Sequence, residues 1–181
     1  MNWDAVDHNY EAERVRPEAS DVWGHMEMLG AYAAGKRVVE FGVHDASTTW
    51  ALLAGRPAWM RSYDTVRRPA VDRVEAATAG FSWKFILESS LVTSLRGMAV
   101  DVLFIDTLHT YAQLQAELAF HSGMVAGHIL MHDTEKFRNI DQLDETPGMM
   151  QAIDEFLAGH PEWVLEAHHT HCHGLTILAR A

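Results

Sequence analysis

Carboxylates and histidines directly follow several apolar segments of this sequence, at the points where those segments stop. The segments VDVLFI and HILM run into Asp106 and into His132-Asp133, and two further apolar segments run into Asp64 and Glu88. A charged group directly after a buried strand is costly unless a partner binds it. In an open parallel sheet, ligands bind beyond the carboxyl ends of the strands. These residues are therefore the first candidates for holding a cofactor, a substrate or a metal ion.

The stretch VVEFGVHDAS, residues 38–47, indicates a strand that stops at a tight turn around Gly42. A dinucleotide fold needs the pattern G-x-G-x-x-G, so that the backbone can approach a pyrophosphate, and here only one of those glycines is present. Glu40 and Asp64 stand 24 positions apart, and an acid about 20 residues beyond such a turn suits the free hydroxyls of a ribose. From the residues alone, the turn holds a dinucleotide, another nucleotide-like cofactor, or no ligand.

The elements that position these residues alternate between strands and helices. The expected strands are 37–41, 58–63, 84–87, 99–105 and 128–131, and the expected helices are 20–34, 47–54, 69–79, 111–124 and 149–157. This alternation predicts an α/β fold in which helices cover both faces of a mostly parallel sheet. Strands at 163–168 and 175–179, joined by a turn at His173-Gly174, are close enough in sequence to form an antiparallel hairpin.

Length and charge exclude several classes of protein. The 181 residues suggest one domain, and a net charge of −11 disfavours nucleic acid as a partner, because such proteins usually carry a basic patch. No apolar segment is long enough to span a bilayer, the N-terminus lacks a secretory pattern, and the single Cys172 fits a reducing compartment. We therefore expect a cytoplasmic protein without a membrane partner, and we expect residues 1–16 to be poorly ordered.

Three motifs carry a family resemblance. The segments EFGVHDAST, DVLFIDTLHTY and GHILMHDT, followed by HGLTIL at 173–178, resemble class I S-adenosylmethionine-dependent methyltransferases. More narrowly, they are similar to the metal-dependent small-molecule O-methyltransferases that act on macrolide sugars and to the cephalosporin hydroxylase-like proteins. The resemblance covers about residues 36–180. It implies a single domain over 1–181 with a Rossmann-like three-layer sandwich, whose seven-stranded sheet is mostly parallel and includes an antiparallel C-terminal hairpin.

The resemblance also implies a site for S-adenosylmethionine at the strand ends. Gly42 would let the backbone approach the methionine part, Asp64 would bind the ribose hydroxyls, and the adenine would lie near Glu88 and Ser89. Ala46 departs from the family pattern, which usually has glycine there, and its methyl group would crowd the cofactor. The full set of predicted cofactor-binding residues is Glu40, Gly42, His44, Ser47, Asp64, Glu88, Ser89 and Asp106.

A divalent metal ion is predicted beside this cofactor. In the strand order that the resemblance implies, Asp106 and Asp133 end neighbouring strands, which lie about 4.8 Å apart, so their carboxylates can share Mg²⁺ or Mn²⁺. The family often has a third ligand at the position of His132, where imidazole favours Mn²⁺, Fe²⁺ or Zn²⁺ unless the ring stays outside the coordination shell. His109, kept neutral by a helix N-terminus, would act as general base on a metal-bound hydroxyl. We thus predict Asp106 and His109 as catalytic residues, and Asp106, His132 and Asp133 as metal ligands.

Two further segments attract attention. The histidines at 168, 169, 171 and 173 are interpreted as an exposed turn, because no second cluster completes a zinc site at ordinary spacing. The long polar segment 134–148 follows the predicted metal site directly and is typical of a functional lid, in which Phe137 and Arg138 would touch substrate.

The leading hypothesis is an S-adenosylmethionine-dependent O-methyltransferase that acts on a hydroxyl of a small polar metabolite. A nicotinamide-dependent oxidoreductase is the first alternative, against which the missing glycines and the C-terminal hairpin argue. A non-catalytic cofactor-binding or interaction domain is the second. Because little chain remains to cover a substrate, a second subunit would supply the cover, which predicts a homo-oligomer.

Overall fold

The computed structural model describes residues 2–15 and 21–181, which divide into two compact units, Met1–Ser89 and Ser90–Ala181. The first unit contains three parallel strands, in which β2 lies between β1 and β3. Its elements in chain order are α1 (Trp3–Arg14), the short 3₁₀ helix η1 (Trp23–His25), α2 (Met26–Ala33), β1 (Arg37–Phe41), α3 (Ser47–Ala54), β2 (Trp59–Asp64), α4 (Pro69–Ala77) and β3 (Trp83–Leu87).

Helix α1 lies within the segment 1–16, for which the sequence predicts poor order. The side chain of Asn2 accepts a hydrogen bond from the amide of Ala5 and thereby caps the helix, and Val6 is fully buried. The guanidinium of Arg56 lies 4.2 Å from the ring of Trp3. The polar composition of this segment hid the single buried valine and the aromatic anchor that fix the helix. The predicted start of the next helix at Ser20 lies outside the described residues.

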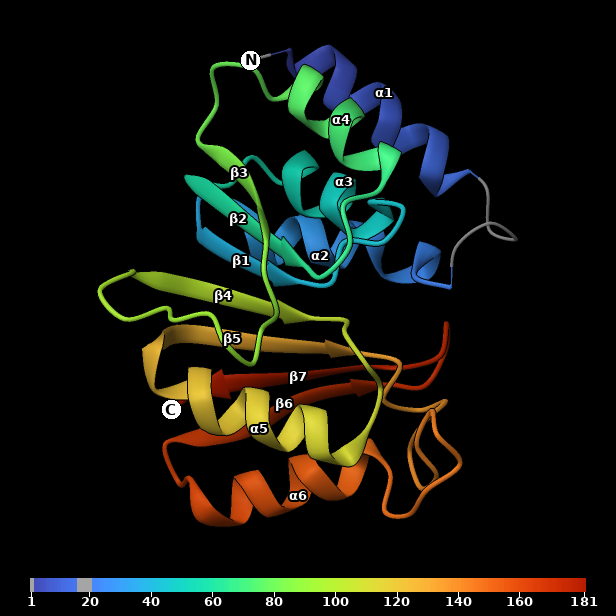
Figure 1. Ribbon diagram of the computed structural model, residues 1–181, viewed down its shortest axis with the longest axis vertical. Helices are drawn as coiled ribbons and strands as arrows, with labels where there is room; N and C mark the ends of the chain where they lie inside the picture. Colours follow the sequence, from blue (N-terminus) through green and yellow to red (C-terminus); the bar gives the residue numbers. More distant parts are fainter. Residues whose placement is uncertain (1, 16–20) are drawn as a thin grey trace. The chain divides into compact units, whose positions relative to one another are not determined.

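The second unit contains four strands and two α-helices. In chain order they are β4 (Val100–Ile105), α5 (Tyr111–His121), the 3₁₀ helix η2 (Ser122–Met124), β5 (Val125–His132), α6 (Met149–Gly159), β6 (Trp163–His169) and β7 (Leu175–Arg180). Strand β4 pairs with β5 in parallel, while β7 runs antiparallel to both β5 and β6. Helices α5 and α6 pack against each other (Figure 1).

The strand order is β3-β2-β1 in the first unit and β4-β5-β7-β6 in the second (Figure 1). The predicted α/β fold, mostly parallel with an antiparallel C-terminal hairpin, is therefore confirmed. The apolar segment VDVLFI forms β4, whose Val102, Leu103 and Phe104 are fully buried, as expected for a strand covered on both faces. Among the described residues, no helix combines the length and the apolar character needed to cross a membrane.

Candidate functional site

The turn after β1 is sharply folded. Gly42, His44 and Ala46 all have positive φ angles, of 89°, 45° and 71°. The amide of Gly42 donates to the carbonyl of Tyr63 at 2.9 Å. Ala46 occupies the N-cap position of α3 in the left-handed region, where a Cβ atom is unfavourable and glycine is the usual residue. The turn thus keeps its shape despite a local cost, which is typical of sites that hold a ligand.

Asp64, at the end of β2, holds this turn in place. One of its carboxylate oxygens accepts hydrogen bonds from the amides of Val43 at 2.9 Å and His44 at 3.1 Å, and the other accepts from the amide of Val66 at 2.9 Å. A carboxylate offers about four lone-pair directions. The three amides leave one direction open to a ligand.

The other residues predicted to bind the cofactor lie in different surroundings. Glu40 is fully buried and accepts hydrogen bonds from the hydroxyls of Thr48 at 2.8 Å and Thr49 at 2.9 Å, so its carboxylate anchors the first turn of α3. Sequence reasoning missed these two threonines. Ser47 donates to Glu13 at 3.0 Å.

Two more predicted residues lie at the end of β3 and belong to the first unit. The amide of Glu88 donates to the carbonyl of Asp64 at 3.0 Å, and its side chain is exposed. Ser89 follows it and is half-buried. Gly42, His44, Asp64 and Glu88 therefore gather at the ends of β1, β2 and β3, whereas the side chains of Glu40 and Ser47 are bonded to other parts of the unit.

In the second unit, four predicted residues form an acid–histidine cluster, which consists of Asp106, His109, His132 and Asp133. Nε2 of His109 lies 2.9 Å from Oδ1 of Asp106 and 3.1 Å from Oδ2 of Asp133. Nδ1 of His132 lies 3.8 Å from Oδ1 of Asp106 and 3.6 Å from Oδ1 of Asp133. Ligand atoms of Asp106, His109 and Asp133 lie within 4.8 Å of one another, which makes them a candidate metal group.

The ends of two parallel strands and the start of a helix build this cluster. Asp106 follows β4, and the paired strand β5 ends at His132. Asp133 then adopts a φ of 61°, and its side chain is only 5% exposed. Thr110 caps α5 by accepting a hydrogen bond from the amide of Gln113 at 3.2 Å, which starts the helix directly after His109. A buried acid in the left-handed region is an unusual combination that points to a function.

The electrostatics of the cluster correct one expectation. Burial by itself would raise the pKa of Asp106, but the interactions with His109 and His132 outweigh it and hold that pKa well below its usual range. Burial lowers the pKa of His109, yet the hydrogen bond to Asp106 and the charges of Asp106 and Asp133 raise it overall. We expected the helix N-terminus to favour neutral imidazole, but two carboxylates at contact distance dominate. A cation bound to both carboxylates would compensate their negative charge in place of the histidines.

The segment 134–148, predicted as a lid, contacts the candidate base directly. Oε1 of Gln142 accepts hydrogen bonds from the amide of His109 at 3.2 Å and from Nδ1 of its ring at 3.0 Å, while the amide of Gln142 donates to the carbonyl of His109 at 3.0 Å. The ring of Phe137 stacks on His109 with centroids 5.1 Å apart and planes 7° apart. Sequence reasoning named Phe137 but missed Gln142, whose position is set by the fold of the loop.

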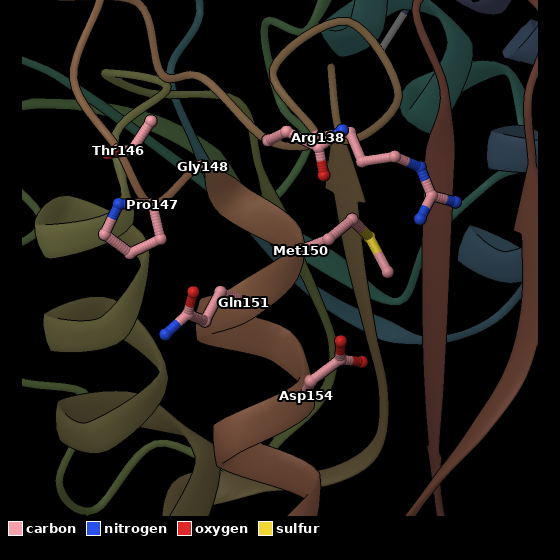
Figure 2. A pocket seen from close by; sticks show the side chains of 8 residues that line it. Arg138, Thr146, Pro147, Gly148, Met150, Gln151 and Asp154 are labelled. Atoms are coloured by element: carbon pink, nitrogen blue, oxygen red, sulfur yellow. The ribbon is translucent and has the colours of Figure 1, made fainter.

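A pocket of about 490 Å³ lies where this segment meets the first turns of α6 (Figure 2). Its lining side chains are mostly polar and come from Arg138, Asn139, Thr146, Pro147, Gly148, Met150, Gln151 and Asp154. Gly148 is required for the packing of the segment, because a Cβ atom there would lie 2.5 Å from the carbonyl oxygen of Phe137. Arg138, predicted to touch substrate, thus borders a polar cavity.

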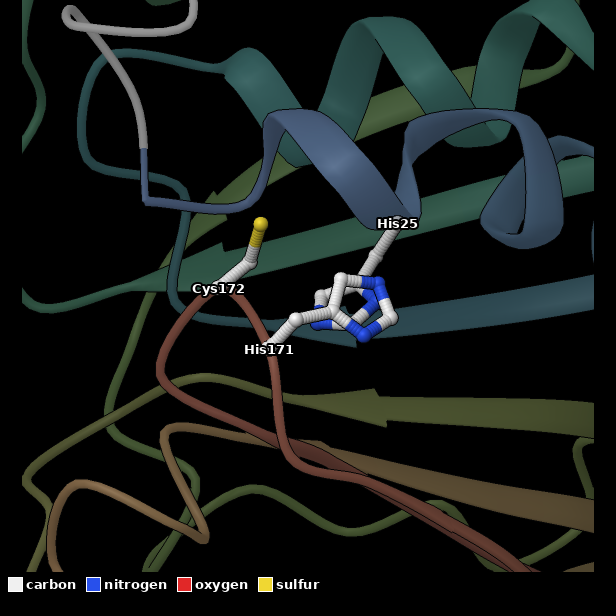
Figure 3. A group of neighbouring side chains, drawn as sticks. All are labelled: His25, His171 and Cys172. Atoms are coloured by element: carbon white, nitrogen blue, oxygen red, sulfur yellow. The ribbon is translucent and has the colours of Figure 1, made fainter.

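The turn between β6 and β7 supports the cluster from another side, although the sequence suggested only an exposed turn. Figure 3 shows His171 and Cys172 on this turn. The carbonyl of Cys172 lies 3.0 Å from Nε2 of His132, and Nδ1 of His173 lies 3.1 Å from Oδ1 of Asp133. Cys172 and His173 are half-buried, so this turn contacts the cluster as well as solvent. The sequence feature that could have indicated this contact is the alternation of polar residues and histidines before Gly174.

The donor set of the cluster fits a divalent cation. Two carboxylates and two imidazole rings converge on one region, and all four groups are among the common protein ligands of divalent metals. The predicted metal ligands Asp106, His132 and Asp133 are therefore brought together, with His109 beside them.

Comparison with known proteins places the fold. No family model matches the chain, and no curated protein matches it in sequence. Solved structures do match it. They include a protein of Corynebacterium glutamicum with 16% identity, a TM-score of 0.68 and coverage of 87% of this chain and 81% of that one.

Two of the matching structures are named methyltransferases. The N-methyltransferase NodS of Bradyrhizobium japonicum, in complex with S-adenosyl-L-homocysteine, shares 14% identity with a TM-score of 0.65 and 99% of both chains covered. The magnesium protoporphyrin IX methyltransferase ChlM of Synechocystis, with the same ligand, shares 16% identity with a TM-score of 0.63 and coverage of 87% and 84%. At these identities the likeness shows the fold alone. The chain has the Rossmann-like fold found in S-adenosylmethionine-dependent methyltransferases.

Proposed function

We propose that this protein is an S-adenosylmethionine-dependent O-methyltransferase that uses a divalent cation and acts on a hydroxyl of a small polar metabolite. The fold shared with NodS and ChlM supports the cofactor, since both were solved with S-adenosyl-L-homocysteine. The observation that carries the transfer to oxygen is the acid–histidine cluster. It combines two carboxylates with an imidazole nitrogen at hydrogen-bond distance from both.

The cofactor would bind at the ends of β1, β2 and β3. Gly42, with its φ of 89°, lets the backbone approach the methionine part closely. Asp64 keeps the turn in shape through Val43 and His44 and offers its remaining lone pair to the ribose. Glu88 and Ser89, which follow β3, would lie near the adenine.

In the proposed reaction, a cation on the two carboxylates would offset the charge that raises the pKa of His109, and the neutral ring would take the proton of the substrate hydroxyl at Nε2. Its Nδ1 lies 3.0 Å from Oε1 of Gln142, an acceptor, so Nδ1 carries the ring proton and Nε2 keeps the lone pair in the neutral form. After proton transfer, the carboxylates of Asp106 and Asp133 stabilise the imidazolium. S-adenosylmethionine would supply the methyl group: the substrate oxygen would bond to its carbon as the carbon–sulfur bond breaks, with S-adenosyl-L-homocysteine as the leaving group.

A cation held by Asp106, His132 and Asp133 would lower the pKa of the substrate hydroxyl by bringing a positive charge beside it. Phe137 and Gln142, which hold the ring of His109, and Arg138, which borders the polar pocket, would position the substrate on the segment 134–148. A homo-oligomer in which a second subunit completes the cover is part of this proposal. A strictly monomeric species in light scattering would contradict that part.

Calorimetric titration with S-adenosylmethionine and S-adenosyl-L-homocysteine, with and without Mg²⁺ or Mn²⁺, tests the proposal first, with NAD as the control. Binding of the methionine cofactor alone supports it and leads to a screen of hydroxylated metabolites for release of S-adenosyl-L-homocysteine. Binding of NAD instead would replace it with an oxidoreductase. Binding of neither cofactor would make the protein a non-catalytic domain.

A further inference from the structure

The orientation of His132 identifies which of its ring nitrogens faces the acid–histidine cluster. Its Nε2 lies 3.0 Å from the carbonyl oxygen of Cys172. A carbonyl oxygen only accepts hydrogen bonds, so Nε2 carries the ring proton. In the neutral ring Nδ1 then holds the lone pair, and Nδ1 is the atom that faces Asp106 and Asp133. His132 is 1% exposed, so water has little access to it.

The distances around Nδ1 suit a shared ion better than a direct hydrogen bond. Nδ1 lies 3.8 Å from Asp106 and 3.6 Å from Asp133, which is longer than an N–H···O hydrogen bond. Ligand atoms that are each about 2.1 Å from one ion lie roughly 3 to 3.5 Å from one another. An ion between Nδ1 and the two carboxylates would be bound by all three groups.

We infer that the cluster selects a divalent transition-metal ion of the Mn²⁺, Fe²⁺, Co²⁺ and Zn²⁺ class over Mg²⁺, and that Nδ1 of His132 is the ligand that makes this selection. Mg²⁺ strongly prefers oxygen ligands, whereas the transition-metal ions accept imidazole. The inference rests on the cation site of the proposed function and not on methyl transfer. His109 keeps its proposed role as base beside the ion.

The turn between β6 and β7 is the outer support of this ligand. A metal-bound histidine usually donates its other ring N–H to a carbonyl or carboxylate, which fixes its tautomer and its orientation. The carbonyl of Cys172 has this role for His132, and His173 contacts Oδ1 of Asp133 at 3.1 Å. The turn between β6 and β7 is itself held in place, because the carbonyl of His173 accepts hydrogen bonds from the amides of Glu135 and Lys136, both at 2.9 Å.

Gly174 permits this close approach. It has a φ of 96°, and a Cβ atom there would lie 2.4 Å from the amide nitrogen of Glu135. Any side chain at this position would therefore push the turn away from the residues that follow β5. The glycine thus ties the C-terminal hairpin to the geometry of the cluster.

The first test is a series of metal affinities of the whole protein after treatment with a chelator. Mg²⁺, Mn²⁺, Co²⁺ and Zn²⁺ are titrated in the calorimeter or against a metal indicator. We expect affinity to rise from Mn²⁺ through Co²⁺, and all three transition metals to bind at least about tenfold more tightly than Mg²⁺. Mg²⁺ binding as tightly as Mn²⁺ would overturn the inference.

A spectroscopic test detects the ligand atoms of the ion directly. In the Mn²⁺-loaded protein, electron spin-echo modulation detects nitrogen atoms directly bonded to the ion. We expect a directly bonded ¹⁴N signal, and modulation from oxygen-bound water and protons alone would remove His132 from the ligand set. His109 can add a second, weaker nitrogen signal whether or not His132 is a ligand. The spectrum of His132→Asn therefore shows whether the stronger signal comes from His132.

Matched variants locate the selection at His132. His132→Asn removes the imidazole lone pair, and His128→Asn changes a histidine earlier on the same strand, which pairs with Glu166 at 3.2 Å. We expect Mn²⁺ affinity to fall at least about tenfold in the first variant and to stay within twofold in the second. His132→Asp supplies an oxygen ligand and should shift the preference toward Mg²⁺. Unchanged selectivity in the folded variants, checked by circular dichroism, would refute the assignment.

A glycine pair tests the outer support. Gly174→Ala should lower Mn²⁺ affinity by about 10- to 100-fold while binding of S-adenosyl-L-homocysteine stays within twofold. Gly97→Ala is the control, because Gly97 has a similar φ of 79° but a Cβ atom there would meet nothing within 4 Å. Equal effects of both substitutions would make the loss a matter of backbone strain and would refute the role of the turn.

These outcomes separate the two proposals. Turnover supported equally well by Mg²⁺ would overturn the metal selection and leave the methyltransferase standing. Transition-metal binding with a nitrogen ligand, in a protein that binds no S-adenosylmethionine, would leave the metal selection standing and overturn the function.

Discussion

Asp64 is the residue whose replacement tests the cofactor site most directly. Its carboxylate accepts three backbone hydrogen bonds, at 2.9, 3.1 and 2.9 Å, from the turn after β1 and from Val66. Hydrogen bonds are worth roughly 1 kcal/mol net each, and water can reach part of this turn once the carboxylate is gone. We therefore expect Asp64→Ala to lower the free energy of unfolding by about 2 kcal/mol.

Asp64→Asn separates the shape of the turn from the recognition of the cofactor. The amide oxygen of asparagine has two lone pairs, which is enough for the amides of Val43 and His44 but leaves no charge for a ribose hydroxyl. We expect the asparagine variant to keep most of the stability that the alanine variant loses. Its affinity for S-adenosyl-L-homocysteine should still fall about tenfold, because hydrogen bonds to a charged acceptor are roughly 1 kcal/mol stronger than those to a neutral one.

Urea unfolding and calorimetric titration with S-adenosyl-L-homocysteine measure the two effects separately. Asp72→Asn is the matched control, since Asp72 is an exposed acid on α4 that pairs with Arg67 at 2.6 Å. Wild-type affinity in Asp64→Asn would refute the ribose contact. Wild-type stability in Asp64→Ala would show that the three hydrogen bonds contribute nothing net and would refute the argument from turn geometry.

Three further substitutions have defined outcomes. Asp106→Ala should abolish metal binding in the calorimeter and leave affinity for S-adenosyl-L-homocysteine within about threefold; a loss of both would contradict the division of roles. Ala46→Gly removes a left-handed strain of about 1 to 2 kcal/mol but also a buried methyl group and some chain stiffness, so unfolding free energy should change by less than about 1 kcal/mol while cofactor affinity rises; weaker cofactor binding would refute the predicted crowding. Burial raises the pKa of Glu117 above its usual 4.5. The protonated carboxyl therefore stabilises the folded state fully below pH 4.5, and this stabilisation is lost as pH rises through the raised pKa. In unfolding titrations Glu117→Gln should therefore gain stability relative to wild type as pH rises from 4 to 8, and a constant difference would refute this.

Much of the fold could be predicted from the alternation of apolar segments and turns. The strands β1, β2 and β4 lie within two residues of their predicted bounds, because each is a short apolar segment closed by glycine or an acid. The predicted helix at 111–124 is shorter, and its last residues form the 3₁₀ helix η2. Helix α1 could not be predicted, since a capping Asn2, one buried Val6 and the ring of Trp3 decide it rather than a periodic apolar face.

Part of the candidate site could likewise be predicted from the sequence, and part could not. The positions of Asp64, Asp106 and Asp133 could be predicted because Asp64 ends a strand and the other two directly follow strands, and strand ends converge in a parallel sheet. Gln142 and the carbonyl of Cys172 could not, since a long loop and a hairpin turn bring them to the cluster from distant positions in the sequence. Glu40 belongs to the motif, and its bonds to Thr48 and Thr49 could not be predicted because the sequence pattern does not show which way its side chain points.

The distribution of backbone strain supports both halves of the proposal independently of any resemblance. Seven non-glycine residues among those described have positive φ angles. Five of them lie in the turn after β1 or beside the acid–histidine cluster, namely His44, Ala46, Asp133, Cys172 and His173. Each costs on the order of 1 kcal/mol, so together they cost about 5 kcal/mol, which is comparable with the whole net stability of an ordinary domain. Ordinary connecting turns do not require such a cost, and its concentration at two places points to ligands that the backbone must approach there.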